Sequence, residues 1–227
     1  MKNHVSIVLF LAIELFLYLS ILFFHFGLPS GYLHYLSIVL CFVFLIIHYQ
    51  KSLDYQIIFI GLFFTVIADF YLTLLGTEQI LGTFFFFLAQ TMYMIRLNYS
   101  KKKHFLESLI PYLFVFILLL VFVGIVILQK IDLLLIVSFL YYSFLLTNLG
   151  NAFVQRKANP LLFLGLIFYL CCDTLVGLSM STPYITFASG GFIDQMIHFP
   201  INLIWFFYLP SQILITLSAK RKNQEII

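Results

Sequence analysis

Charged residues are scarce in this sequence. They make up 9% of the 227 residues, whereas apolar residues make up 63%; a soluble domain has roughly 25% and 45–50%. A water-soluble fold of this length could not bury so much apolar surface, so lipid must surround most of the chain. Backbone groups in lipid need internal hydrogen bonds, which leaves helices or a closed barrel. Because the apolar runs are continuous rather than alternating, we predict an all-α integral membrane protein.

Other signals are also missing. Cys41, Cys171 and Cys172 lie within apolar runs, without the spacing of a disulfide framework or a zinc site. The sequence has no H-E-x-x-H, G-x-S-x-G, P-loop or dinucleotide motif, so it does not support the common motif-bearing enzyme classes. The first apolar run lacks a small-residue cleavage site, and we expect a retained helix rather than a signal peptide.

Eight apolar runs predict eight membrane spans in a single domain covering residues 1–227. A bilayer core of roughly 30 Å requires about 20 apolar residues per helix. The predicted spans are 5–26, 32–49, 55–75, 79–97, 105–128, 133–151, 160–180 and 195–218. In this arrangement Lys130 is the only lysine or arginine opposite the N-terminus. The basic clusters therefore predict cytosolic N- and C-termini in a bacterial plasma membrane, and not a nucleic-acid-binding surface.

Two aspartates share a sequence context. Gly-Leu-x-Phe begins eight residues before Asp69 and again eight residues before Asp173. At about 1.5 Å per residue, both carboxyl groups should lie at one depth in the outer half of the bilayer. Neighbouring carboxylates in lipid cannot both ionise easily, which favours a general acid paired with a base. The alternative is a protonated pair that only bridges helices.

A second sequence similarity lies in the spans that follow those of the two aspartates. FFFLAQ ends at Gln90 and FFYLPSQ ends at Gln212, which suggests a parallel repeat of four spans plus four. We predict that both glutamines, with Tyr93 and Tyr208 one turn away, bind substrate. The glutamines alternatively serve as interhelical hydrogen-bond partners. For Glu14, alone in the first span, a contact to another helix and a role in the cavity are both open.

Three histidines are candidate metal ligands. His25, His34 and His198 should all lie toward the outer side, near the aspartates, and three histidines with a carboxylate can hold zinc. No two of them are one helical turn apart. We therefore predict no metal site and no cofactor.

Three motifs, in this order, resemble the YhhN family of eight-span membrane proteins, whose characterised members are lysoplasmalogenases. They are Gly61-Leu62 with Asp69-Phe70-Tyr71-Leu72, then Cys172-Asp173-Thr174-Leu175, and finally Tyr208-Leu209-Pro210-Ser211-Gln212-Ile213-Leu214-Ile215. The resemblance covers nearly the whole chain from the third span onward. The family usually has histidine where Gln90 stands, and glutamine does not titrate near neutral pH.

The resemblance implies hydrolysis of the vinyl ether bond of a lysophospholipid within the bilayer, giving a fatty aldehyde and a glycerophospho-headgroup. Asp69 and Asp173 would be the catalytic acid and base. Two other functions remain open. One is a carrier that moves a small or lipid-like solute with intramembrane carboxylates. The other, an intramembrane aspartyl protease, is disfavoured because Gly-x-Gly-Asp is missing at both aspartates.

Overall fold

The computed structural model describes residues 2–24, 30–99, 105–128, 131–182 and 184–219, and these are helical with no strand among them. The elements, in chain order, are α1 (Lys2–Phe23), α2 (Ser30–Ile47), α3 (Leu53–Asp69), η1 (Phe70–Leu75), α4 (Gln79–Tyr99), α5 (Phe105–Leu118), η2 (Leu119–Leu128), α6 (Leu133–Val154), α7 (Pro160–Met180), α8 (Phe192–Ile197) and α9 (Leu203–Ser218). The segments η1 and η2 are π-helical continuations of α3 and α5. The prediction of an all-α fold is confirmed.

Six helical segments are long and apolar enough to cross a membrane. They are 4–23, 53–75, 79–99, 106–123, 133–154 and 160–180. Two further apolar helices, 31–47 and 203–218, are shorter than 18 residues. Length and composition thus indicate an integral membrane protein with at least six spans among the described residues.

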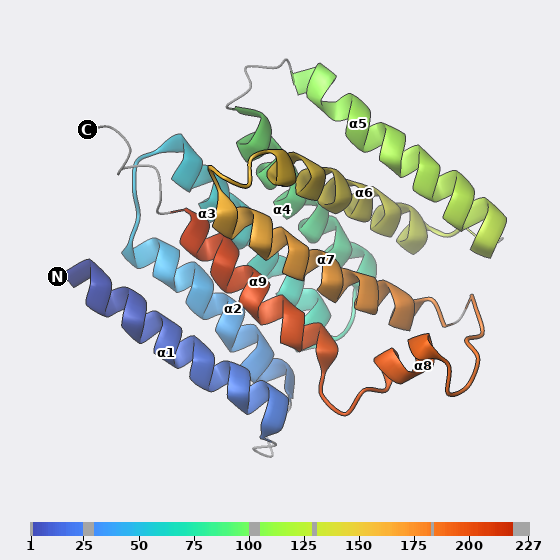
Figure 1. Cartoon of the computed structure of the whole chain (residues 1–227), viewed down its shortest axis with the longest axis horizontal. Helices are drawn as coiled ribbons and strands as arrows, with labels where there is room; N and C mark the ends of the chain where they lie inside the picture. Colours follow the sequence, from blue (N-terminus) through green and yellow to red (C-terminus); the bar gives the residue numbers. More distant parts are fainter. Residues whose placement is uncertain (1, 25–29, 100–104, 129–130, 183, 220–227) are drawn as a thin grey trace.

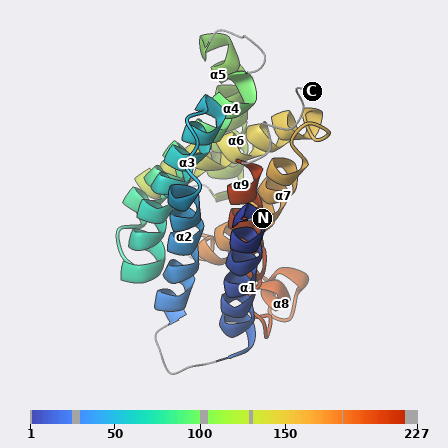
Figure 2. The ribbon, with the colours of Figure 1, turned by 90° about the vertical axis from the view of Figure 1, so that its left-hand side faces the viewer.

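The long helices lie side by side in one bundle (Figure 1). α7 packs most extensively on α9, and α3 on α4, which also packs on α6. α5 lies at the edge of the bundle against α6. Figure 2 shows that α8 lies at the end of the bundle where α1 finishes. We call this end the outer end, and the end where α1 begins the inner end.

Helix starts follow local capping signals. Ser52 Oγ accepts a hydrogen bond from the Tyr55 amide at the start of α3, at 3.3 Å. Asp132 caps α6 through the Leu135 amide at 2.9 Å. Pro160 occupies the first turn of α7, where its missing N–H costs nothing. These caps place the helix starts within two residues of the predicted spans.

The last predicted span, 195–218, is not one helix. α8 ends at Ile197, and α9 begins only at Leu203. Pro200 explains the break, because proline lacks an amide hydrogen and disfavours a helical residue before it. Asn202 then caps α9, its Oδ1 accepting from the Trp205 amide at 3.3 Å. The apolar run hid this helix boundary.

The two Gly-Leu motifs mark equivalent helix contacts. A Cβ atom on Gly61 would lie 2.8 Å from Tyr93 Cε1, and one on Gly165 would lie 2.9 Å from Ile215 Cγ1. Tyr93 follows Gln90 by three residues, and Ile215 follows Gln212 by three. α3 therefore meets α4 at the positions where α7 meets α9. The four-plus-four repeat as a whole stays a prediction.

Candidate active site

Asp69 is the last residue of α3, at the point where the helix changes from α to π. Its side chain is buried, with 2% exposure. Oδ2 accepts a hydrogen bond from Tyr208 Oη of α9 at 2.5 Å, and Oδ1 accepts from Thr73 Oγ1 at 3.2 Å. Single π-helical turns are frequent at functional sites. Both oxygens of this carboxyl group therefore face hydroxyl donors.

Asp173 lies in the uninterrupted helix α7 and is half-buried. Its Oδ2 accepts a hydrogen bond from Tyr141 Oη of α6. The adjacent Tyr142 instead bonds Thr174 Oγ1 at 2.8 Å, on the exposed side of the same helix pair. Two consecutive tyrosines of α6 thus hold two consecutive residues of α7, and only one of these bonds involves a carboxyl group.

Aromatic side chains join the two aspartates into one cluster. The Phe86 ring of α4 lies 5.8 Å from the Tyr141 ring, 6.1 Å from Tyr169 and 6.3 Å from Tyr208, measured between centroids. Tyr169, one turn before Asp173, lies close enough to interact electrostatically with both carboxyl groups. The two carboxyl groups also interact with each other. We call these residues, Asp69, Phe86, Tyr141, Tyr169, Asp173 and Tyr208, the aspartate cluster.

Trp205 and His34 border the aspartate cluster on its outer side. The Trp205 ring meets the Tyr208 ring edge-on at 5.1 Å. His34 of α2 stacks on Trp205 with the ring centroids 4.0 Å apart. His34 therefore packs as an aromatic side chain in this structure. His198 instead pairs with Asp194 on the outer surface, and His25 lies outside the described residues. Among the described residues, no cluster of histidine, cysteine and acidic side chains is suited to a metal ion.

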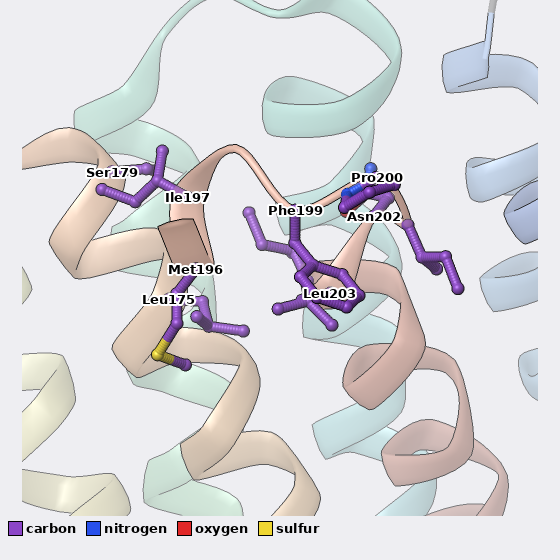
Figure 3. A pocket seen from close by; sticks show the side chains of 10 residues that line it. Leu175, Ser179, Met196, Ile197, Phe199, Pro200, Asn202 and Leu203 are labelled. Atoms are coloured by element: carbon purple, nitrogen blue, oxygen red, sulfur yellow. The ribbon is translucent and has the colours of Figure 1, made fainter. Parts of the chain in front are cut away.

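A hollow of about 360 Å³ opens at the outer end of the bundle, just beyond this border (Figure 3). Most of its lining residues are apolar, but polar atoms contribute nearly half of its surface. The lining comes from α7, α8, the connection into α9 and the start of α9: Leu175, Ser179, Met196, Ile197, Phe199, Pro200, Ile201, Asn202, Leu203 and Ile204. Leu175 follows Asp173 by two residues, and Ile204 precedes Tyr208 by one turn. The hollow therefore lies next to the aspartate cluster along both helices.

The outer connection after α7 is tied to the start of α6. Tyr184 Oη donates a hydrogen bond to Asp132 Oδ2 at 2.6 Å. This bond to a carboxylate raises the pKa of the Tyr184 phenol, because losing the proton would also lose the bond. The same carboxylate caps α6 through Oδ1. Asp132 therefore holds the segment between α7 and α8 against the start of α6.

The other predicted binding residues lie in different places. Tyr208 belongs to the aspartate cluster. Gln90 faces α6, where its Oε1 accepts from Asn148 Nδ2 at 2.9 Å, as expected for an interhelical partner. Tyr93 packs against Gly61, which precedes Asp69 by eight residues or about 12 Å of helix. Gln212 is fully buried one turn inward from Tyr208. Their roles in substrate binding stay predictions.

A charged pair at the inner end was not expected from the sequence, where Arg96 served only as an orientation signal. Arg96 Nε and Nη2 donate to the two carboxylate oxygens of Asp54 at 2.9 and 2.8 Å. Arg96 Nη1 also donates to Ser218 Oγ at 2.6 Å, and Nη2 donates to the Ser218 carbonyl at 2.9 Å. This network ties α3, α4 and α9 together, and it satisfies every charge that it contains.

Three members of the aspartate cluster were missed by sequence reasoning: Phe86, Tyr141 and Tyr169. Tyr169 had a usable signal, since it lies one turn before Asp173 on the same helix face. Phe86 and Tyr141 had none, because aromatic residues occur on every face of these spans. Only the packing of α4 and α6 against α7 selects them.

Each of the three motifs that carried the family resemblance contributes one residue to the aspartate cluster: Asp69, Asp173 and Tyr208. The model of the YhhN family matches residues 32–219, which is most of the chain. No curated protein and no solved structure matches this chain. The matched region includes every residue of the aspartate cluster. The chain therefore belongs to the YhhN family.

Proposed function

We propose that this protein is a membrane-embedded hydrolase that cleaves the vinyl ether bond of a lysophospholipid, giving a fatty aldehyde and a glycerophospho-headgroup. The observation that carries this proposal is the pairing of Asp69 and Asp173 in one buried cluster lined by tyrosine hydroxyls. In the part of the chain that the structure describes, neither carboxyl group has a lysine or arginine partner. Carboxyl groups left without a counter-charge in a membrane are candidates for proton transfer.

The chemistry requires one acid and one base. A proton added to the β-carbon of the vinyl ether gives an oxocarbenium ion, and water then adds to the adjacent carbon. The base removes a proton from that water, and the resulting hemiacetal breaks down to aldehyde and alcohol. The reaction ends with the proton on the other carboxyl group, so proton exchange between the two resets the site. Such paired roles suit two carboxyl groups held at close quarters.

The hydrogen bonds favour one assignment of these roles. Asp69 accepts from hydroxyl groups at both oxygens, the arrangement of an ionised carboxylate. Asp173 is less buried and lies beside the hollow. We therefore assign proton donation to Asp173, and cation stabilisation and water activation to Asp69. The Tyr208 and Tyr141 hydroxyls would position the two carboxyl groups.

The hollow supports a lipid substrate. Polar and apolar atoms contribute nearly equally to its surface, which suits the junction of chain and headgroup in a lysolipid, and its volume lies at the lower end of the range for ligand sites, about 300–1,000 Å³. It lies at the outer end of the bundle, and its nearest lining residue on α7, Leu175, is two residues from Asp173. We propose that the lipid enters from the outer leaflet through this hollow, with its vinyl ether bond reaching the aspartates.

We further propose eight spans, built as a parallel repeat of four plus four with cytosolic termini in a bacterial plasma membrane. The equivalent glycine contacts of α3 with α4 and of α7 with α9 support the repeat. The inner end carries the described basic side chains of Lys51, Arg96, Arg156 and Lys157, which supports a cytosolic inner end. α2 and α9 would complete the eight as spans shorter than the usual length.

The test is aldehyde release by the purified protein in lipid nanodiscs. Three lysolipids with the same headgroup are compared, carrying a vinyl ether, a saturated ether or an ester at the same position. The proposal predicts aldehyde from the vinyl ether and no product from the saturated ether, because only the vinyl ether can accept a proton on carbon. If a folded protein leaves the vinyl ether intact, the hydrolase proposal is wrong, and flux assays for a carrier follow.

A further inference from the structure

A second group of polar side chains lies near the middle of the bundle, inward from the aspartate cluster. It consists of Glu14 of α1, Cys41 of α2, Tyr93 of α4, and Gln212 and Thr216 of α9, and we call it the central polar cluster. Each of these side chains is fully buried, with 0% exposure. The proposed hydrolysis uses none of them directly, and a carboxyl group at this depth is costly without compensation.

The members of the central polar cluster are neighbours. Cys41 Sγ donates to Glu14 Oε1 at 3.4 Å, and the Cys41 thiol also interacts with the Thr216 side chain. Tyr93 lies close enough to Cys41 for an electrostatic interaction. Gln212 and Thr216 are one turn apart on the same face of α9. Four helices thus bring polar atoms to one place.

Several polar atoms in this cluster make no hydrogen bond of standard geometry to the described residues. Glu14 Oε2, Gln212 Oε1, Thr216 Oγ1 and Tyr93 Oη are buried without a hydrogen bond of standard geometry among the described residues. A buried polar atom left unpaired costs about 1–3 kcal/mol. Gln212 Oε1 is an acceptor, and so is Glu14 Oε2 when Glu14 is ionised. The hydroxyls of Thr216 and Tyr93 can both donate and accept. Water, which donates twice and accepts twice, matches this mixture.

We propose that the central polar cluster is a binding site for ordered water. Buried waters in proteins bond otherwise unsatisfied polar groups and make about three hydrogen bonds each. The unpaired oxygens of Glu14 and Thr216 beside Cys41 are such groups. In this site Glu14 positions water through its free oxygen, and Cys41 occupies a wet environment although it lies deep within the bundle.

The site continues toward both ends of the bundle. Outward, Tyr208 lies one turn from Gln212 and bonds Asp69. Inward, Ser218 follows Thr216 by two residues and bonds Arg96. Polar groups on α9 therefore run from the aspartate cluster to the inner end. Supply of water to the aspartates along this line rests on the proposed hydrolase function, whereas the water site itself does not.

A different face of α4 provides a comparison. Met94 follows Tyr93 directly, but it packs in a separate core with Tyr112 and Phe144. Its exposure is 1%, nearly the same as that of Cys41. Cys41 and Met94 are thus two buried, readily oxidised sulfur atoms, of which only Cys41 lies in the proposed water site.

The test is hydroxyl-radical footprinting by X-ray radiolysis of the full-length protein in nanodiscs, read by mass spectrometry. Radicals form from water, so side chains beside ordered water are oxidised even when buried. Each oxidation rate is divided by the intrinsic reactivity of the free amino acid, because a thiol reacts faster than a thioether. After this correction we expect Cys41 to be oxidised several-fold faster than Met94, with the exposed Met180 as the reference for full reaction. If Cys41 is as protected as Met94 while Met180 reacts, the cluster is dry and the proposal is wrong.

Two variants make the test specific to the polar atoms. Glu14→Leu and Thr216→Val should each lower Cys41 oxidation several-fold, toward the level of Met94. Glu14→Gln keeps two polar atoms and should preserve the oxidation. Unchanged oxidation in both Glu14→Leu and Thr216→Val would overturn the proposal. Because this measurement does not depend on activity, failure of the hydrolase proposal would leave its result readable.

Discussion

The two ends of α3 each carry an aspartate, and the two sites are built differently. Asp54, in the first turn, faces the Arg96 guanidinium, which donates to both of its oxygens. Asp69, the last residue, accepts from the hydroxyls of Tyr208 and Thr73, and from no other side chain in the described part of the protein. The arginine neutralises the first carboxylate and fixes three helices. The hydroxyls hold the second in place without supplying a counter-charge, which leaves it available for the proposed proton transfer.

The largest expected effect comes from neutralising the uncompensated carboxyl groups. Asp69→Asn or Asp173→Asn should lower kcat for vinyl ether hydrolysis by about 10²–10⁴-fold, the usual contribution of general acid–base catalysis. Asparagine has nearly the same size, so the fold should persist. Initial rates of aldehyde release, with Asp54→Asn as the matched control, measure this. Full activity in either variant would remove that aspartate from the mechanism.

At the other end of α3, the same substitution should affect stability instead. Asp54→Asn leaves the Arg96 guanidinium, 3% exposed, without its counter-charge. Removing one partner of a buried ion pair costs about 3 kcal/mol or more. Unfolding in a denaturing detergent titration should show this loss, while kcat of the folded fraction stays near the wild-type value. A variant as stable as the wild type would mean that this ion pair contributes little.

The tyrosine hydroxyls should have an intermediate effect. Tyr208→Phe and Tyr141→Phe each remove a hydrogen bond to a carboxyl group, and we expect kcat to fall about 10- to 100-fold. Tyr142→Phe is the matched control, because its hydroxyl bonds Thr174 rather than Asp173. The comparison requires kcat values with KM measured separately. Equal loss in all three variants would point to packing rather than to positioning of the carboxyl groups.

The smallest effect is expected at the glycines that let the helices approach. Gly61→Ala and Gly165→Ala place a methyl group against Tyr93 and Ile215. Overpacking costs typically 1–3 kcal/mol, and the higher helix propensity of alanine offsets about 1 kcal/mol of it. We therefore expect a net loss of about 1 kcal/mol in unfolding free energy. Gly177→Ala, where nothing lies within 4 Å, should not destabilise. Stability gains at Gly61 and Gly165 would contradict the close contacts.

Much of this molecule could be predicted from its sequence. Continuous apolar runs predicted the helical membrane fold, because only helices satisfy the backbone within such runs in lipid. The repeated context of Asp69 and Asp173 predicted that they share a depth, and the structure brings them into one cluster. Tyr208, which was predicted to bind substrate because it lies one turn from Gln212, bonds Asp69 in that cluster, and its role in substrate binding stays a prediction.

The remaining features depend on how each helix is rotated about its own axis. The sequence of a single span does not determine this rotation. The spans are apolar on all sides, so periodicity does not show which face of α4 meets α3 and which meets α6. Gln90 was therefore grouped with the aspartates, although it faces Asn148 of α6. Tyr141 and Phe86 were missed for the same reason. The break before α9 follows from Pro200, whereas the apolar run alone predicts a continuous helix.

The central claim is that the aspartate cluster delivers a proton to carbon. Hydrolysis in deuterium oxide tests it directly, with the aldehyde trapped as an oxime as it forms and analysed by mass spectrometry. Protonation of the β-carbon predicts one deuterium on carbon 2 of the aldehyde in the wild type, and loss of product in Asp69→Asn and Asp173→Asn. Aldehyde released without deuterium on that carbon would contradict the mechanism.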